Sequence, residues 1–464
     1  MRRYFFWLLL FTVRSGAGLF AQAAPADTVQ SASTLREIFS KGIHAGHFRS
    51  FLMITDNEPG LSDYYALAAG GDLHFQSAAL EGFSFGIGGN FNFNLASSDL
   101  SKKDPLSGAA NRYELGLFDV ENPTNKTDLD RMDEFKIRYQ NSRLIISLGK
   151  QGIQTPFINF QDGRMRPTAV NGLWNEIRLS KNALLTGGWL WGISPRSTVR
   201  WYKIGASIGV YPSGLNPDGS ASGYPQHLQT KGIALLGFKK SFGKNWNLQI
   251  WDQYVDHIFN TFFAQTEWNT TLNNTSELRA GLQSTIQHPL AEGGNPELDK
   301  TYFPVNQHAL VVSSMVGFKH HRFDYQIAYT RAADEGRFLM PREWGREPFY
   351  TFMARERMEG SGNVHAVTVR VNWQSKSKQW KTGVAYGHFY LPDVKDVAMN
   401  KYAFPAFRQF NADFRYAFGG IFKGLHAQFL YVWKGQIGET YGNNRLVINR
   451  VNMSHFNLIL NYFY

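Results

Sequence analysis

The chain of 464 residues lacks cysteine, and it lacks any apolar run long enough to cross a membrane as a helix. A helical span needs about 20 apolar residues, whereas the most apolar stretch, residues 4–13, has ten and is followed by Arg14. Without thiols, disulfide staples and thiolate metal sites are excluded. The chain is therefore neither a helical membrane protein nor a disulfide-stapled domain.

Motifs of catalysis and phosphate binding are also missing. The sequence has no H-E-x-x-H, no G-x-S-x-G and no P-loop. His320 and His321 fall in a short polar stretch, where a solvated pair is expected rather than a metal site. Basic residues are dispersed along the chain and form no stripe of the kind that binds nucleic acid. We predict no catalytic residue, no metal, no cofactor and no nucleic-acid partner.

The N-terminus has the pattern of a secretory signal. Arg2 and Arg3 precede the apolar run, and Ala-Gln-Ala follows at 21–23. We therefore expect a signal peptide at 1–23, a polar periplasmic lead-in at 24–43 and one further domain at 44–464. A membrane anchor is the alternative, but the run is too short for it. Without the three arginines of the signal, 45 basic residues face 37 acidic ones, a net charge of +8.

The residues that are abundant favour a membrane β-barrel. Aromatic residues make up 15% of the chain, yet the mean hydropathy is slightly polar at −0.32. Residues 454–464 read S-H-F-N-L-I-L-N-Y-F-Y, with aromatic and aliphatic side chains on one strand face and polar ones on the other. The apolar face of such a strand suits lipid once the barrel closes and removes the strand edge.

Strand-like segments of about ten residues recur along the chain. Phe323, Tyr325 and Ile327, for example, alternate with polar residues. Short turns are expected near 78–81, 141–142, 180–182, 241–244, 271–274, 319–321, 374–378 and 418–421. Longer connections alternate with them near 56–62, 96–130, 152–171, 192–227, 258, 288–305, 333–361, 392–405 and 436–447. This predicts an all-β, antiparallel transmembrane barrel of eighteen strands, with a range of sixteen to twenty because 203–211 also reads as a strand and the connection at 258 is very short.

If the apolar stripes face lipid, the opposite faces line a lumen. A lumen dominated by one sign of charge favours counter-ions. The alternation places a ladder of bases inside: Lys136, Arg138, Arg143, Arg178, Arg279, Arg370 and Arg415. Each base could instead brace the wall by pairing with a carboxylate. The excess of bases nevertheless indicates a preference for anions or carboxylate-bearing solutes, since arginine offers a carboxylate a fixed fork.

Two long connections mix aromatic residues with paired charges, unlike bland surface loops. The first, 152–171, contains Q-D-G-R-M-R-P-T at 161–168. The second contains M-P-R-E-W-G-R-E-P-F-Y-T-F at 340–352, with Arg342 and Arg346. Segments of this kind are typical of loops folded into a lumen, and packing at the barrel rim is the alternative.

These two motifs, with I-S-P-R-S-T at 193–198, L-P-D-V-K-D at 391–396 and N-R-Y-E-L-G-L-F-D at 111–119, resemble the OprD family of outer-membrane porins, most closely its Bacteroidetes-type branch. The resemblance covers nearly the whole chain after the signal. It implies a generally monomeric, eighteen-stranded barrel narrowed by inward-folded loops. Carried over by position, Asp162, Arg164 and Arg166 would lie at or near the constriction. The residues that decide the solute do not align with better-studied branches.

The sequence thus predicts a substrate-selective passive diffusion channel for small, carboxylate-bearing solutes in the outer membrane of a Gram-negative bacterium. Its partners would be those solutes together with outer-membrane lipid and lipopolysaccharide. Two alternatives stay open: an outer-membrane barrel enzyme of the lipase or protease type, and a structural or adhesive barrel with a closed lumen.

Overall fold

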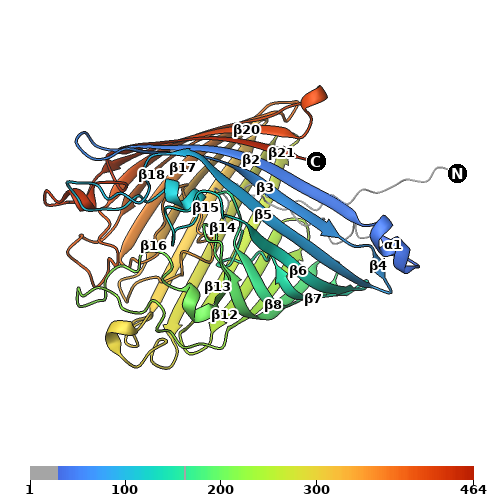
Figure 1. The fold of residues 1–464 in the computed structure, drawn as a ribbon. Coiled ribbons are helices and arrows are strands. Elements are labelled where there is room, and N and C mark those ends of the chain that lie inside the picture. The colour runs from blue at the N-terminus through green and yellow to red at the C-terminus, as the bar shows by residue number, and fades with distance from the viewer. Residues whose placement is uncertain (1–29, 161–163) are drawn as a thin grey trace.

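The computed structural model describes residues 30–160 and 164–464, so the expected signal peptide lies outside the described residues. Eighteen long antiparallel strands pair with their neighbours along the chain. The first, β2 (Ile43–Asp56), also pairs with the last, β21 (Met453–Phe463). The sheet therefore closes on itself, as Figure 1 shows, and no long strand is left with a free edge. The predicted eighteen-stranded barrel is confirmed.

The other wall strands are β3 (Tyr64–Gln76), β5 (Phe83–Ser97), β6 (Arg131–Gln140), β7 (Leu144–Gln151), β8 (Ala169–Ser180), β9 (Ala183–Ser194), β11 (Ile233–Phe242), β12 (Trp246–Val255), β13 (Phe259–Asn273), β14 (Ser276–Pro289), β15 (Ala309–His320), β16 (Phe323–Ala332), β17 (Val364–Gln374), β18 (Trp380–Tyr390), β19 (Phe407–Ala417) and β20 (Leu425–Gln436). The short elements are β1 (Ser31–Ala32), α1 (Leu35–Ser40), β4 (Ala79–Leu80), η2 (Glu114–Leu117), β10 (Tyr202–Lys203), α2 (Ile204–Ser207), η3 (Leu298–Lys300), η4 (Gly420–Phe422) and η5 (Asn444–Leu446). Among the described helices, none has the length and apolar character to cross a membrane.

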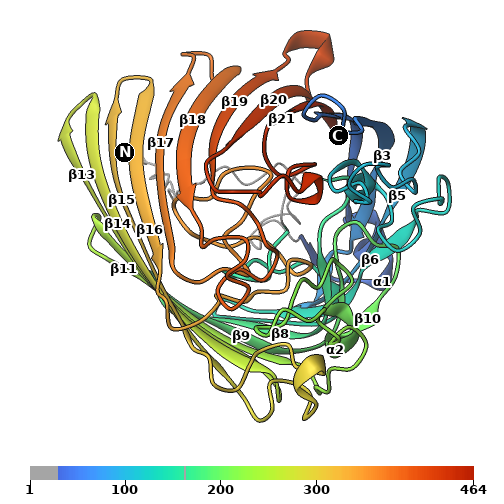
Figure 2. The same ribbon diagram turned by 90° about the vertical axis from the view of Figure 1, so that its left-hand side faces the viewer.

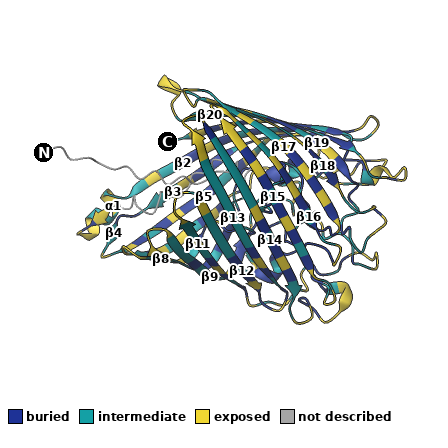
Figure 3. Ribbon diagram, turned by 180° about the vertical axis from the view of Figure 1, so that it is seen from behind, coloured by how far each residue is buried: buried dark blue, intermediate teal, exposed yellow. Residues whose placement is uncertain are grey.

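Side chains alternate between the two faces of the wall, as Figure 3 shows by its banded strands. On β21, Leu458, Leu460 and Tyr462 are exposed on the outside, whereas His455 and Asn457 are fully buried inside. The same alternation holds on β16, where the apolar residues are exposed and the polar ones turn inward. The outer surface is thus an apolar band that suits lipid, and the polar faces enclose the interior.

The connections divide the barrel into two unlike ends. Eight short turns, of two to seven residues, join strands at one end of the described barrel, and nine connections, most of them longer, join strands at the other. At the turn before β5, Glu81 (φ 50°) and Gly82 (φ 86°) both have positive φ, which suits a two-residue hairpin turn. Figure 2 shows the long connections crossing the opening of the barrel.

The two uncertain places in the strand pattern are resolved by the structure. Residues 203–211 add no wall strand, because β10 is two residues long and α2 follows it directly. The short connection near 258 is real, since β12 ends at Val255 and β13 begins at Phe259. The connection expected at 152–171 ends three residues earlier, because β8 begins at Ala169.

Candidate functional site: the pore lumen and its constriction

A cavity of about 3190 Å³ occupies the inside of the barrel. Residues of the long connections line it, such as Arg112 and Arg346, and so do residues of the short turns, such as Arg143 and Lys244. One cavity therefore extends from the end with the long connections to the end with the turns, as a path for a solute requires.

The cavity wall is strongly basic. Its described lining contains 24 lysine and arginine residues against six aspartate and glutamate residues. Low-dielectric walls focus such a field along the axis and raise the local concentration of anions. The charge of the lumen thus favours anions over cations.

The connection 333–363 between β16 and β17 folds into the barrel and is fixed to its wall. The indole N–H of fully buried Trp344 donates to the hydroxyl of Ser207 at 2.8 Å. On β14, the amide of Gln287 donates to the carbonyl of Leu339 at 2.8 Å and accepts its N–H at 3.0 Å. These contacts hold the segment that carries Trp344 at a fixed position inside the barrel.

The connection 152–168 is joined to this inward loop through Asn159. Its backbone N–H donates to the carbonyl of Trp344 at 3.3 Å. Its side-chain amide donates to the carbonyl of Arg346 at 2.9 Å and accepts the Arg346 N–H at 3.1 Å. The two connections that the sequence singles out therefore meet. Asn159 holds the backbone of Arg346 through both its carbonyl and its N–H.

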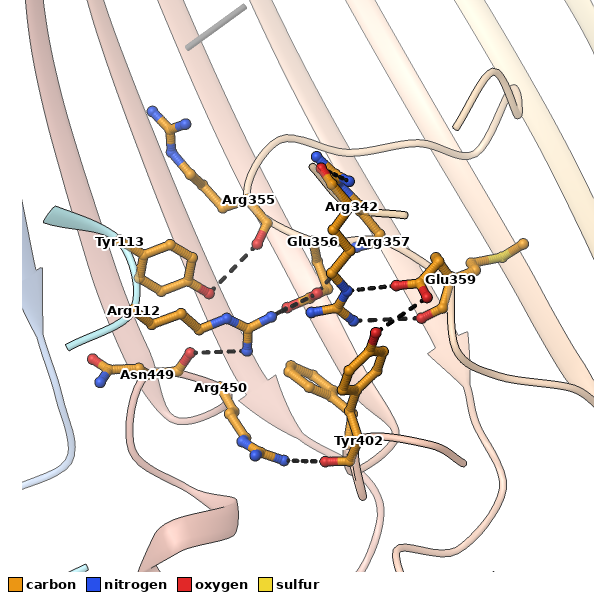
Figure 4. Close-up of polar contacts among 12 residues, drawn as sticks. Arg112, Tyr113, Arg342, Arg355, Glu356, Arg357, Glu359, Tyr402, Asn449 and Arg450 are labelled. Carbon is orange, nitrogen blue, oxygen red and sulfur yellow. Dashed lines mark hydrogen bonds and ion pairs between the residues drawn. The ribbon is translucent and has the colours of Figure 1, made fainter. Parts of the chain in front are cut away.

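A second contact cluster ties the inward loop to three more connections, as Figure 4 shows. Arg112 donates to the carboxylate of Glu356 at 3.0 Å, and Lys434 on β20 reaches the same carboxylate at 2.9 Å. Arg342 pairs with Glu359 at 2.5 Å, and the hydroxyl of Tyr402 donates to Glu359 at 3.2 Å. Both carboxylates are almost fully buried.

A fall in pH should loosen this cluster, because protonation of Glu356 removes its ion pairs with Arg112 and Lys434. Burial acts to raise the pKa of its carboxyl, but Arg112 and Lys434 outweigh burial and lower the pKa to about 2. A depressed pKa gives stability that is present above the ordinary pKa of 4.5 and is lost as pH falls toward 2. We expect Glu356→Gln to lower the free energy of local opening by about 3 kcal/mol at pH 7. Amide hydrogen exchange of residues 340–359 measures it, and equal exchange in both proteins would contradict it.

Glu347 should have the opposite pH dependence. Burial raises the pKa of its carboxyl from 4.5 to about 7, although the N–H groups of Met358 and Glu359 donate to it at 2.7 and 3.2 Å. The stability that follows from a raised pKa is present below pH 4.5 and is lost as pH rises through 7. We expect Glu347→Gln to protect residues 340–359 more than wild type at pH 8.5 and about equally at pH 5, measured by hydrogen exchange at each pH. Identical protection at pH 8.5 would contradict the prediction.

Some of the expected constriction residues line the cavity in the structure, and others do not. Arg164, Arg342 and Arg346 line the cavity. Arg166 does not: its side chain is 1% exposed and donates to the carbonyls of Leu129 and Phe118, which braces the connection between β5 and β6. Asp162 lies outside the described residues.

The residues of the expected basic ladder also fall into those that line the cavity and those that do not. Arg143, Arg178, Arg279, Arg370 and Arg415 line the cavity. Two of these have carboxylate partners on the wall, Arg279 with Asp324 and Arg415 with Asp413 at 2.6 Å. Lys136 and Arg138 alternate with the exposed residues of β6 but are not part of the cavity wall, and Lys136 pairs with Glu134 at 2.9 Å.

Six described arginines of the long connections line the cavity but were not among the expected site residues: Arg112, Arg196, Arg355, Arg357, Arg445 and Arg450. The first two stand in motifs that support the family resemblance, at 111–119 and 193–198. These motifs could have indicated Arg112 and Arg196 as site residues from the sequence alone. Arg450 lies in the connection before β21, where the sequence offers no comparable motif.

Comparisons with known proteins agree with this architecture. The family model described as "outer membrane porin, OprD family" matches residues 105–352. OccAB2 of Acinetobacter baumannii is 14% identical with a TM-score of 0.71, over 92% of this chain and 99% of that one. OpdK of Pseudomonas aeruginosa, solved with vanillate, is 13% identical with a TM-score of 0.68, over 92% and 99%. A search of curated proteins gives no match.

A closed eighteen-stranded barrel that encloses a large basic cavity has the architecture of a porin. The family match extends over more than half of the chain, and the chain belongs to the OprD family of outer-membrane porins. It is thus an outer-membrane porin for small solutes, and the members of its family are porins rather than enzymes.

Proposed function

We propose that this porin is a substrate-selective, passive diffusion channel for small solutes that carry a carboxylate. The observation that carries the proposal is the lining of the cavity, with 24 bases against six acids. Arginine gives a carboxylate two parallel hydrogen bonds without a change in protonation. The related OpdK was solved with vanillate, which is an aromatic carboxylate.

The constriction would be formed by connections 152–168 and 333–363, with Arg164, Arg342 and Arg346 facing the solute. Arg342 is neutralised by Glu359, and its guanidinium lies 3.7 Å over the ring of Tyr402. Arg346 lies 5.2 Å over the ring of Phe352 and forms no ion pair with another described residue. Arg346 is therefore the stronger candidate for contact with a carboxylate, while Arg342 chiefly holds the loop. Conduction requires such contacts to be weak and repeated.

Three further parts of the proposal concern the setting of the channel. The N-terminal signal at 1–23 would export the chain, and the lead-in at 24–43 would lie in the periplasm with α1. The exposed apolar band would contact outer-membrane lipid and lipopolysaccharide. The barrel would be complete as a monomer, since one chain closes the sheet and lines the whole described cavity by itself.

Single-channel recording of the refolded chain in a planar bilayer tests the proposal. A tenfold salt gradient gives the ion preference, and benzoate is then titrated as a small carboxylate. We expect small discrete steps, a reversal potential on the anion side and benzoate-dependent block. A folded barrel, shown by heat-modifiable gel migration, that gives no steps would instead indicate a closed lumen. Steps with a cation preference would reject the carboxylate proposal.

A further inference from the structure

The eight short turns carry a marked excess of positive charge. Their residues include one acid, Glu81, and seven bases. The bases are Arg143, Lys181, Lys244, Arg322, Lys376, Lys378 and Lys423. In the proposed orientation this end faces the periplasm, because short turns lie on that side of bacterial outer-membrane barrels.

Most of this charge faces the lumen. We define the turn-side collar as the turn bases that line the cavity together with three bases at strand ends. Its members are Arg143, Arg178, Lys181, Lys244, Lys319, Arg322, Lys378 and Lys381. All eight are exposed. None of them forms an ion pair with another residue of the described ranges 30–160 and 164–464.

The collar differs from the contact cluster of the inward loop, where charges are compensated. There, Glu359 pairs with Arg342, and Glu356 pairs with Arg112. Near the collar, the acids Asp324 and Asp413 pair with wall arginines rather than with collar members. The charge of the collar is therefore not compensated by ion pairs within the described ranges, and an anion arriving from the periplasm would meet it first.

The size of the collar indicates the kind of anion. Its members belong to five turns: those between β6 and β7, β8 and β9, β11 and β12, β15 and β16, and β17 and β18. Neighbouring turns are two strand separations apart, about 10 Å. A compact anion can contact one or two such turns, whereas an extended polypeptide with carboxylates at intervals can contact all five. Because the collar lines the cavity, lipid head groups outside the wall are poorly placed to reach it.

We propose that the turn-side collar is a docking site for an acidic polypeptide segment that approaches the barrel from the periplasm. The segment would be held by many long-range charge contacts with flexible side chains. Such contacts raise the rate of association and give strong salt dependence. The proposal goes beyond selectivity for small carboxylates, because it requires only the turn-side charge and not the constriction.

The probe is poly-L-glutamate of about 20 residues, added to single channels whose orientation is known. Orientation is obtained from Asn182→Cys, since the chain has no other cysteine: a biotin maleimide on this turn residue recruits streptavidin only from the turn side. We expect half-block at a concentration at least about tenfold lower from the turn side than from the other side. Equal block from both sides would overturn the proposal.

Matched variants test whether the collar residues cause the block by polyglutamate. The collar variant R143Q/K181Q/K244Q/R322Q/K378Q should raise the half-block concentration by about tenfold or more. The control K376Q/K423Q removes turn bases that do not line the cavity and should change it less than about twofold. An unchanged collar variant would reject the proposal. Should that variant not fold, 1 M salt on wild type gives the same test, because screening should abolish turn-side block.

Two further experiments test whether lipid head groups occupy the collar and whether the collar proposal stands apart from the proposed carboxylate selectivity. Phosphatidylglycerol in the turn-side leaflet should leave the half-block concentration unchanged. A tenfold rise would mean that lipid head groups occupy the collar, against the proposal. Benzoate block and the reversal potential of wild type report on the proposed function. Their failure with turn-side polyglutamate block intact would reject carboxylate selectivity and leave the collar proposal standing.

Discussion

Arg346→Ala should move the reversal potential toward cations and weaken benzoate block by about tenfold or more. Arg346 lines the cavity, and its backbone is held by Asn159, so its removal takes away charge without releasing the loop. A hydrogen bond to a charged group contributes about 1.5–3 kcal/mol, and 1.4 kcal/mol corresponds to about tenfold in a dissociation constant. Bilayer recording in a salt gradient with added benzoate measures both quantities.

Lys136→Ala is the matched control for this result. It also removes one inward positive charge, but Lys136 pairs with Glu134 and does not line the cavity. We expect a shift in reversal potential well below that of Arg346→Ala. Equal effects from both variants would mean that the total charge of the barrel sets selectivity. In that case the inward loops would not form the selective constriction.

The barrel could be predicted from the sequence because the alternation of apolar and polar residues that specifies each strand lies within a few consecutive residues. On β16, Phe323, Tyr325 and Ile327 had to face lipid once their neighbours Asp324 and Gln326 faced water, and the structure shows this arrangement. The alternation of turns and long connections gave the strand number for the same reason. Residues 203–211 show the limit of the rule: their pattern suits a strand, but only Lys203 pairs with a neighbouring strand, at Gly192 of β9, before α2 begins at Ile204.

The contacts of the inward connections could be predicted only in part, because they join residues far apart in the chain. Arg164 and Arg166 stand two residues apart in one motif, yet one lines the cavity and the other braces the connection between β5 and β6. That difference depends on the positions of Phe118 and Leu129, which no pattern within 152–168 encodes. Arg112 was missed likewise, since its partner Glu356 lies 244 residues away.

Trp344→Ala should enlarge the pore and reduce its selectivity. Trp344 is fully buried, with its ring 6.4 Å from that of Phe259 and its N–H bonded to Ser207. Loss of a buried tryptophan costs about 3–5 kcal/mol, which falls on the loop because the closed sheet keeps its own hydrogen bonds. We expect conductance to rise about twofold or more, with noisier steps and weaker benzoate block.

Trp246→Ala distinguishes a released loop from a general effect of losing a tryptophan. Trp246 begins β12 at the turn side, is half exposed, and contacts Trp268 rather than the inward loop. Its replacement should leave single-channel conductance unchanged, because nothing inside the barrel depends on it. Unchanged conductance in folded Trp344→Ala would place the narrowest part of the pore elsewhere. A larger conductance in that variant alone would mean that the connection between β16 and β17 sets the pore size, since Trp344 acts only through the position of that connection.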